Sequence, residues 1–192
     1  KRAIEDSAAP ILNEDGDIQG IVMVFRDVTE KKIKQDEILY LSYHDSLTTL
    51  YNRRYIEERI KQIEKMESYP LSIILGDING LKMVNDVLGH YEGDRFLIEA
   101  SKILMESCRQ SDIVARWGGD EFLILLPNAN AAEAELICEN INKKCAELTS
   151  MRIKLSISLG YATRKNDKEE ITRTINTAEE VMYTQKMLNS RS

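Results

Sequence analysis

The residues best suited to chemistry in this sequence are carboxylates that stand at the ends of apolar, strand-like runs. Asp77 ends the run "SIILGD", and Asp120 and Glu121 interrupt the apolar stretch "ARWGGDEFLILLP". Aspartate and glutamate are poor strand residues, so their place between two apolar runs needs another explanation. If the run that ends at Asp77 pairs beside the hairpin 112–126, Asp77 and Asp120 meet at one edge of a sheet. Two adjacent carboxylates repel each other unless a cation lies between them.

A magnesium ion suits such a pair, because Mg²⁺ prefers a few carboxylate oxygens together with the phosphates of a substrate. Gly118 and Gly119 precede the two acids, and glycine permits a turn in which the backbone approaches a phosphate chain closely. The plainer interpretation is a solvated hairpin tip without a ligand. Composition alone favours that interpretation, so the surrounding motifs must decide.

Apolar periodicity outlines the elements that would position these carboxylates. From residue 45 onward, helices alternate with short apolar strands, and one hairpin lies among them. This order indicates a sheet with helices on both faces. The expected helices cover residues 53–66, 81–88, 92–108, 130–148 and 168–188, and the expected strands cover residues 71–78, 112–117, 121–126 and 152–162.

The first 28 residues do not look like a complete domain. "RAIEDSAAPILN" and "DIQGIVMVFRDVT" are strand-like, and "EDGD" between them is a hairpin turn signal. A hairpin alone is only marginally stable in water, so this one is expected to have lost the rest of its sheet.

A linker helix is expected over residues 29–44, with Thr29 as its cap. Ile33, Ile38 and Leu41 trace a narrow apolar stripe along it, which suits a coiled coil with a second copy of the chain. Packing of this helix on its own domain is an equally open alternative.

Composition narrows the classes of partner. The 192 residues carry a formal net charge of −6 and are 43% hydrophobic, enough for one sizeable core plus an appendage. An acidic chain binds DNA and anionic membranes poorly, so no nucleic-acid polymer and no membrane contact are expected. The three cysteines have no metal-ligand spacing and are expected to be reduced packing residues. The expected location is the cytoplasm, either for a separate protein or for the cytoplasmic part of a larger, membrane-attached one.

Five motifs in order resemble those of the GGDEF family, the diguanylate cyclases. They are "HDSLTTLYNRR", "GDINGLKMVNDVLGHYEGDRFL", "RWGGDEF", "SISLGYA" and "AEEVMYTQK", and they cover about residues 42–188. The segment that ends in "DVTE" resembles the last two strands of a PAS sensor domain with its exit motif; an ordinary two-stranded extension is the alternative. The expected organisation is a PAS-like C-terminal fragment at 1–28, a signalling helix at 29–44 and a GGDEF domain at 45–192.

The resemblance implies an α/β (α+β) fold, a cyclase- or polymerase-palm-like mixed sheet of about five strands flanked by helices, after an N-terminal β-hairpin and linker helix. It implies a reaction that joins two GTP molecules into cyclic di-GMP and releases two pyrophosphates, with Mg²⁺ or Mn²⁺ as cofactor. Each subunit would hold one GTP, in a homodimer formed through the linker helix and facing active sites. Positioning and charge neutralisation would carry the catalysis.

The resemblance also assigns roles at the acidic positions. Asp77 and Asp120 would be the metal carboxylates, and the carbonyl of Ile78 a further ligand. Glu121 would help to deprotonate the attacking 3′-hydroxyl.

The nucleotide itself would be bound by four other matched residues. Asn85 and Asp94 would read guanine, because a carboxylate accepts from a pair of donors that adenine does not offer. Lys82 and Lys186 would contact phosphates. Residue types alone favour ordinary roles for Asn85 and Asp94, as a helix-face residue and an N-terminal helix acid. Either lysine could equally be a solvated charge.

Arg109 and Asp112 match the family's inhibitory product site, "RxxD", in residue types and in spacing to the glycine turn. An arginine can grip a phosphate or stack on guanine, and an aspartate can accept from the guanine edge. The alternative is a surface ion pair of little consequence.

Three positions depart from the family pattern: Thr49 replaces a glycine, Asn79 replaces an aspartate and Ser190 replaces an arginine. Asn79 removes a negative charge beside the expected metal, and "DINGLKMVND" resembles GGDEF domains that precede HD-GYP phosphodiesterase domains. The alternative function is therefore a catalytically weak or inactive module that binds GTP or cyclic di-GMP and regulates an adjacent domain such as a phosphodiesterase. A scaffold that binds no nucleotide is a third possibility, against which the retained carboxylates argue.

One structural contact is also expected beside the glycine turn. Arg116 lies on the strand just before it, and Asp45 opens the first family motif. An ion pair between them would fasten the end of the linker to the acidic hairpin.

Overall fold

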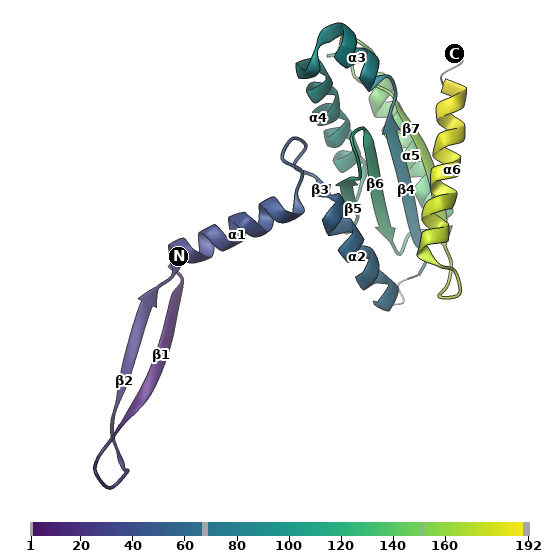
Figure 1. Ribbon diagram of the computed structural model, residues 1–192. Coiled ribbons are helices and arrows are strands. Elements are labelled where there is room, and N and C mark those ends of the chain that lie inside the picture. Colours follow the sequence, from purple (N-terminus) through teal and green to yellow (C-terminus); the bar gives the residue numbers. More distant parts are fainter. Residues whose placement is uncertain (1, 67–68, 151, 190–192) are drawn as a thin grey trace. The chain divides into compact units, whose positions relative to one another are not determined.

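The computed structural model describes residues 2–66, 69–150 and 152–189 (Figure 1). The chain divides into two compact units, residues 1–42 and 43–192. Within the described ranges, no helix combines the length and the apolar character needed to cross a membrane.

The first unit contains the expected hairpin and helix. Strands β1 (Ile4–Leu12) and β2 (Ile18–Asp27) pair antiparallel and are followed by α1 (Thr29–Tyr43). Asn13 organises the turn, because its Oδ1 accepts hydrogen bonds from the amides of Asp15 and Asp17 at 3.1 and 2.7 Å. Both strands are exposed along almost their whole length, and the origin of this piece in a PAS-like domain stays a prediction.

The expected cap of α1 is wrong in its detail. The Thr29 hydroxyl accepts a hydrogen bond from the Ala3 amide at 3.0 Å, so it closes the base of the hairpin. Asp27 takes the helix-starting role instead, because its Oδ1 accepts from the Thr29 amide at 3.0 Å. A residue two positions upstream thus satisfies one of the amides that a helix start leaves open.

The second unit is built on a five-stranded mixed sheet in the order β3-β5-β6-β4-β7. Its strands are β3 (Tyr51–Asn52), β4 (Leu71–Ile78), β5 (Ile113–Arg116), β6 (Glu121–Pro127) and β7 (Ile157–Arg164). β3 runs parallel to β5, and all other neighbours are antiparallel. The predicted fold class is confirmed.

Two boundaries in this sheet differ from the prediction. β3 has only two residues and no apolar alternation that could announce it. β7 was expected from residue 152 but begins at Ile157, which pairs with Ile78 at the end of β4. Residues before Ile157 alternate as a strand would, but β4 ends at Ile78, and the one further hydrogen bond, from the Asn79 amide to the Ser156 carbonyl oxygen at 2.9 Å, is not continued as a strand in the described part of the chain.

Helices cover both faces of the sheet (Figure 1). The sequence alternation along β4 decides which face each side chain reaches: Ile74 and Ile78 belong to one core, and Ile73 and Leu75 belong to the other. Asp77 shares the face of Leu75. The first core includes α3 (Leu81–Leu88), α4 (His90–Ser107) and α5 (Ala131–Glu147), and the second includes α2 (Arg53–Met66) and α6 (Ile171–Asn189).

Helix α6 lies unusually close to β7. A Cβ atom on Gly160 would come within 2.1 Å of the Met182 amide nitrogen and 2.2 Å of the Ala178 carbonyl oxygen. Only glycine lets these two backbones approach so closely. The last turns of α6 are thereby brought to the strand end that carries Asp77.

Candidate functional site

Strand register brings the predicted carboxylates to one end of the sheet. Asp77 on β4 stands directly opposite Glu121 on β6. The Ile78 amide donates to the Asp120 carbonyl oxygen at 3.0 Å, so the tip of the hairpin is fastened to the end of β4. The predicted pairing of the two elements is confirmed. Asp77, Asp120 and Glu121, together with Lys186, are called the acidic edge below.

Asp77 is the most deeply placed member of the acidic edge, with 4% of its surface exposed. Its Oδ2 accepts from the Lys186 ammonium at 2.7 Å. Its Oδ1 is buried and accepts no hydrogen bond from any described residue. Burial raises the pKa of Asp77; the hydrogen bond from Lys186 opposes that shift and the charge of Asp120 adds to it.

Glu121 lies among the same negative charges. Burial raises its pKa, and the negative charges of Asp77, Asp120 and Glu179 add to the shift. Glu179 was not singled out from the sequence. Its spacing of seven residues from Lys186 on one helix would have placed both on the same face of α6.

Lys186 was expected to contact a phosphate, but the structure places its ammonium on Asp77. Burial lowers the pKa of Lys186, yet the hydrogen bond with Asp77 and the charges of Asp120 and Glu121 outweigh burial and raise it. Lys186 is therefore a charged partner that partly neutralises the acidic edge.

The glycine turn is held by Arg116, as predicted. Its guanidinium donates to both carboxylate oxygens of Asp45 at 3.1 and 3.3 Å and to the Gly119 carbonyl oxygen at 2.7 and 3.2 Å. Asp45 also accepts from the amide and hydroxyl of Thr48 at 2.8 and 2.7 Å. Although burial raises the pKa of Asp45, Thr48 and Arg116 together hold it below its usual range. The ion pair ties the start of the second unit to the turn that carries Asp120.

Beside this turn lies a hollow of about 440 Å³ between α3, α4 and the hairpin tip. Gly118 does not line it; a Cβ there would lie 2.8 Å from Glu121 Oε2, so Gly118 makes room for the Glu121 side chain. Several predicted nucleotide residues and one predicted metal carboxylate are thus gathered around one concavity, whereas Asp77, Glu121 and Lys186 are not among the residues that line it. Those that line it are Lys82, Asn85, Asp94, Gly119 and Asp120.

Gly93, which sequence reasoning did not single out, shapes this hollow from α4. A Cβ at Gly93 would lie 1.9 Å from Asn85 Oδ1 and 2.9 Å from its Cγ. Gly93 therefore forms a notch that seats the Asn85 side chain, next in the chain to Asp94.

Asn79 is engaged away from the carboxylates. Its Nδ2 donates to Ser156 Oγ at 3.2 Å, and its Oδ1 accepts from Ser158 Oγ at 2.8 Å. Asn189 on α6 donates to the same Ser158 hydroxyl at 3.1 Å. Asn79 thus links the ends of β4, β7 and α6, whereas Ser190 lies outside the described residues.

The donor set of the acidic edge fits a divalent cation. Asp77 Oδ1 is a buried oxygen without a partner among the residues described, and Asp120 stands beside it. No group of three His, Cys, Asp or Glu side chains in the described ranges forms a metal cage by itself. Two carboxylates with a backbone carbonyl and substrate phosphates are nevertheless a set that suits Mg²⁺, which rarely uses an all-protein cage.

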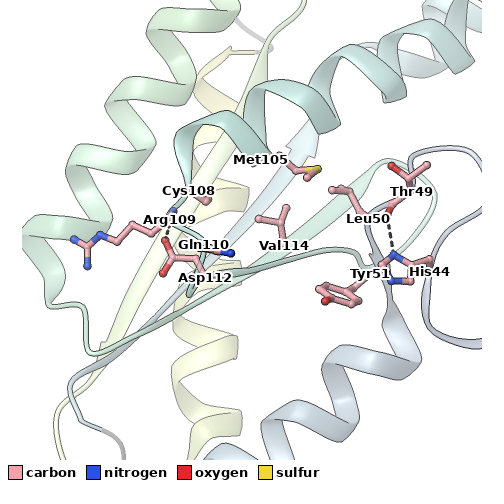
Figure 2. A pocket seen from close by; sticks show the side chains of 10 residues that line it. All are labelled: His44, Thr49, Leu50, Tyr51, Met105, Cys108, Arg109, Gln110, Asp112 and Val114. Atoms are coloured by element: carbon pink, nitrogen blue, oxygen red, sulfur yellow. Dashed lines mark hydrogen bonds between the residues drawn. The ribbon is translucent and has the colours of Figure 1, made fainter. Parts of the chain in front are cut away.

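Arg109 and Asp112 form a second, separate feature, called the arginine turn below (Figure 2). Asp112 folds back on the turn, where its Oδ2 accepts from the Arg109 amide at 2.7 Å. The Arg109 guanidinium points toward α5 and donates to Glu133 Oε1 at 2.6 Å. Both residues line a hollow of about 320 Å³, which also includes Thr49.

Thr49 stands in a left-handed backbone conformation, with φ of 62°. This region is costly for a β-branched residue and easy for glycine. Threonine at this position, where the family pattern has glycine, therefore strains the backbone.

Comparison with known proteins agrees with this geometry. The family model described as "Diguanylate cyclase, GGDEF domain" matches residues 42–191. The probable diguanylate cyclase DgcE of Escherichia coli is 36% identical over 138 residues, which are 70% of this chain and 12% of that protein. The chain spans about a quarter or less of the length of several relatives it matches.

Solved structures show the same likeness. The coiled coil and GGDEF domain of DgcB from Caulobacter crescentus, in complex with c-di-GMP, gives a TM-score of 0.75 at 20% identity over 83% of this chain and 88% of that one, which establishes the fold. A microbial GGDEF domain whose structure describes an interaction with bis-(3′,5′)-cyclic di-GMP gives 0.68 at 28% identity, over 78% of this chain and 94% of that one. With a family match over most of its length, the chain belongs to the GGDEF domain family of diguanylate cyclases.

Proposed function

We propose that this chain is a diguanylate cyclase domain that condenses two GTP molecules into cyclic di-GMP and two pyrophosphates. The observation that carries the proposal is the buried Oδ1 of Asp77, which has no partner among the described residues, beside Asp120 and Glu121. A purely structural cluster would not leave a buried carboxylate oxygen without a partner, because that costs free energy.

Asp77, Asp120 and the carbonyl of Ile78 would hold Mg²⁺ or Mn²⁺. The cation would neutralise charge on the triphosphate and so assist departure of pyrophosphate. Lys186 offsets part of the same negative charge through its 2.7 Å contact with Asp77.

Asn85 and Asp94 select guanine from the wall of the hollow. Guanine offers two adjacent donors to a carboxylate, and adenine leaves those acceptors unpaired. Lys82, which lines the same hollow, supplies positive charge for the phosphates.

Glu121 accepts the proton of the attacking 3′-hydroxyl. Its raised pKa brings a carboxylate closer to the range in which a general base works best. The 3′-oxygen forms a bond to the α-phosphorus of the other GTP, the bond between that phosphorus and the bridging oxygen to the β-phosphate breaks, and pyrophosphate leaves with the electron pair.

Each chain holds one GTP, so the reaction requires two chains facing each other. The helix over residues 29–44 brings them together, and the PAS-like piece at 1–28 belongs to the sensor part of a cytoplasmic signalling protein. The ion pair of Asp45 with Arg116 fastens the residues that follow this helix to the glycine turn.

Arg109 and Asp112 bind the product, cyclic di-GMP, and limit its accumulation. The guanidinium grips a phosphate and the carboxylate accepts from guanine.

A second function has one specific observation in its favour. Asn79 supplies no charge at the acidic edge and is bound instead to Ser156 and Ser158. A module that binds GTP or cyclic di-GMP and regulates a neighbouring domain, without turnover, would tolerate this loss.

Incubation of the chain with GTP and Mg²⁺, followed by chromatography of the products, separates the two functions. Cyclic di-GMP formation that disappears in Asp120→Ala supports the cyclase. Binding of GTP without product, measured by calorimetry, supports the regulatory module. Absence of both product and nucleotide binding would overturn both proposals.

A further inference from the structure

The arginine turn already contains an anion of its own. Glu133 on α5 places Oε1 2.6 Å from Arg109 Nη2, where a phosphate oxygen of a ligand would also bind. The charge and hydrogen bond of Glu133 raise the pKa of Arg109, and those of Arg109 lower the pKa of Glu133. The guanidinium is thus engaged before any ligand arrives.

Glu133 is held in this position from its other side. Its Oε2 accepts from the Asn130 amide at 2.9 Å, and Asn130 Oδ1 accepts from the Glu133 amide at 3.1 Å, which is a capping box at the start of α5. A capping box fixes the glutamate side chain against the helix end. One carboxylate oxygen is therefore committed to the helix and the other is presented to Arg109.

Asp112 is engaged in the same way, since it accepts from the Arg109 amide at 2.7 Å. This contact shapes the turn and leaves the guanidinium as the group on which ligand phosphate and Glu133 compete. Arginine has five N–H donors, so sharing is sterically possible, but a phosphate beside the Glu133 carboxylate would meet a like charge.

We infer that Glu133 is a built-in competitor that sets the affinity of the arginine turn for a phosphodiester. The inference rests on the proposed product site and deepens it, because it names the residue that regulates that site. Release of Glu133 from Arg109 frees the guanidinium for the phosphate, and any event that repositions the start of α5 changes the affinity of the site.

The expected size of the effect follows from exposure. The side chains of Arg109 and Glu133 are 53% and 35% exposed, and ion pairs in such positions are weak and screened by salt. Removal of the competing charge should therefore tighten binding by about two- to fivefold.

The test is titration calorimetry of the full chain with cyclic di-GMP at low salt, comparing wild type with Glu133→Gln. Glutamine keeps the capping box, because its carbonyl oxygen can still accept from the Asn130 amide. The NH2 group that replaces Oε1 carries no negative charge and cannot accept a hydrogen bond from Arg109. The dissociation constant should fall by about two- to fivefold, and the gain should shrink as salt is raised. Glu139→Gln, an equal charge change at an exposed position of the same helix, should leave affinity unchanged.

Arg109→Ala separates this inference from the function on which it rests. If wild type binds, Arg109→Ala weakens binding and Glu133→Gln equals wild type, the competitor role is wrong and the product site stands. If wild type does not bind, or Arg109→Ala binds equally well, the product site is wrong and the inference falls with it. An equal gain in Glu139→Gln would reduce the effect to net charge and would also overturn the inference.

Discussion

The acidic edge and the arginine turn present charge in opposite ways. At the acidic edge, three carboxylates crowd around one lysine at the ends of buried strands. Asp77 is only 4% exposed, and one of its oxygens has no hydrogen-bond partner in the described part of the chain. At the arginine turn, a half-exposed guanidinium is satisfied by Glu133, and Asp112 is satisfied by the backbone of the turn.

The difference indicates what a ligand must do at each place. A cation at the acidic edge relieves repulsion that the fold already holds, so binding gains free energy from the native arrangement. A phosphate at the arginine turn must replace a contact that is already made. The first feature thus has an acceptor left open for a ligand, whereas the second has its charged groups already paired.

The largest effect is expected from disturbing the close packing of α6 on β7, which positions Lys186 at the acidic edge. Gly160→Ala would force α6 away from β7, because the new Cβ meets backbone atoms of Met182 and Ala178 at 2.1 and 2.2 Å. We expect a loss of about 3 kcal/mol in the free energy of unfolding, the upper end of overpacking effects. Urea unfolding followed by the fluorescence of Trp117, the only tryptophan, measures it.

Gly119→Ala, in the same unit, is the matched control. No atom lies within 4 Å of the added Cβ there. Equal effects of the two substitutions would mean that close helix packing at Gly160 is not what positions α6.

A smaller effect is expected from the notch at Gly93. Gly93→Ala should displace Asn85 and reduce the preference for GTP over ATP, by about 1–3 kcal/mol if a buried polar group loses its partner. In an Asn85→Ala background the same substitution should have no further effect on selectivity, because no side chain remains to displace. Calorimetry of the four variants with both nucleotides completes this cycle, and strict additivity would contradict the seating role.

The layout of the sheet was predictable from the sequence, because β4 and β6 each contain an uninterrupted apolar run, residues 73–75 and 122–126, and the hairpin has a clear glycine turn. The start of β7 was not predictable, because whether residues 152–156 form a strand depends on where β4 ends. The predicted helix cap at Thr29 was wrong for a related reason. The Thr29 hydroxyl has a non-local partner, the Ala3 amide, which a local capping rule does not consider.

The candidate site, like the fold, was predictable only in part. Motif spacing placed Asp77, Asp120 and Arg116 in the right neighbourhood. The partner of Lys186, the clash that Gly93 avoids and the contact of Arg109 with Glu133 all arise between separate elements. Such contacts follow from how helices pack on the sheet, which no local pattern specifies.

Strain beside the arginine turn offers a stabilising substitution. Thr49→Gly should raise the free energy of unfolding by about 0.5–1 kcal/mol, because relief of the left-handed conformation at φ of 62° exceeds the added flexibility of the unfolded chain. Asn128, at φ of 55°, is the control, since asparagine tolerates this conformation and Asn128→Gly should change stability less. Urea unfolding in which Thr49→Gly is no more stable than wild type would place the strain elsewhere.

The substitution with the smallest expected effect tests whether the carboxylates of the acidic edge repel one another. The pKa of Asp77 and that of Glu121 are raised in the folded chain, with burial as the first cause and the Asp120 charge among the others. Stability from these carboxyls is therefore present below their ordinary pKa of about 4 and is lost as the pH rises through the raised values. Asp120→Asn removes one repelling charge, so without divalent cations it should raise the free energy of unfolding at pH 7 by a few tenths to about 1 kcal/mol, and the gain should vanish near pH 3.

The control for this substitution is Asp36→Asn, an equal charge change at an exposed position of α1, which should show no such pH dependence. Addition of Mg²⁺ and GTP should reverse the order, because the wild type binds them and gains stability by mass action while Asp120→Asn does not. A variant that is less stable than wild type at pH 7 without the cation would mean that Asp120 stabilises the hairpin tip more than it repels its neighbours. The acidic edge would then be satisfied in the same sense as the arginine turn, and the contrast between the two would rest on burial alone.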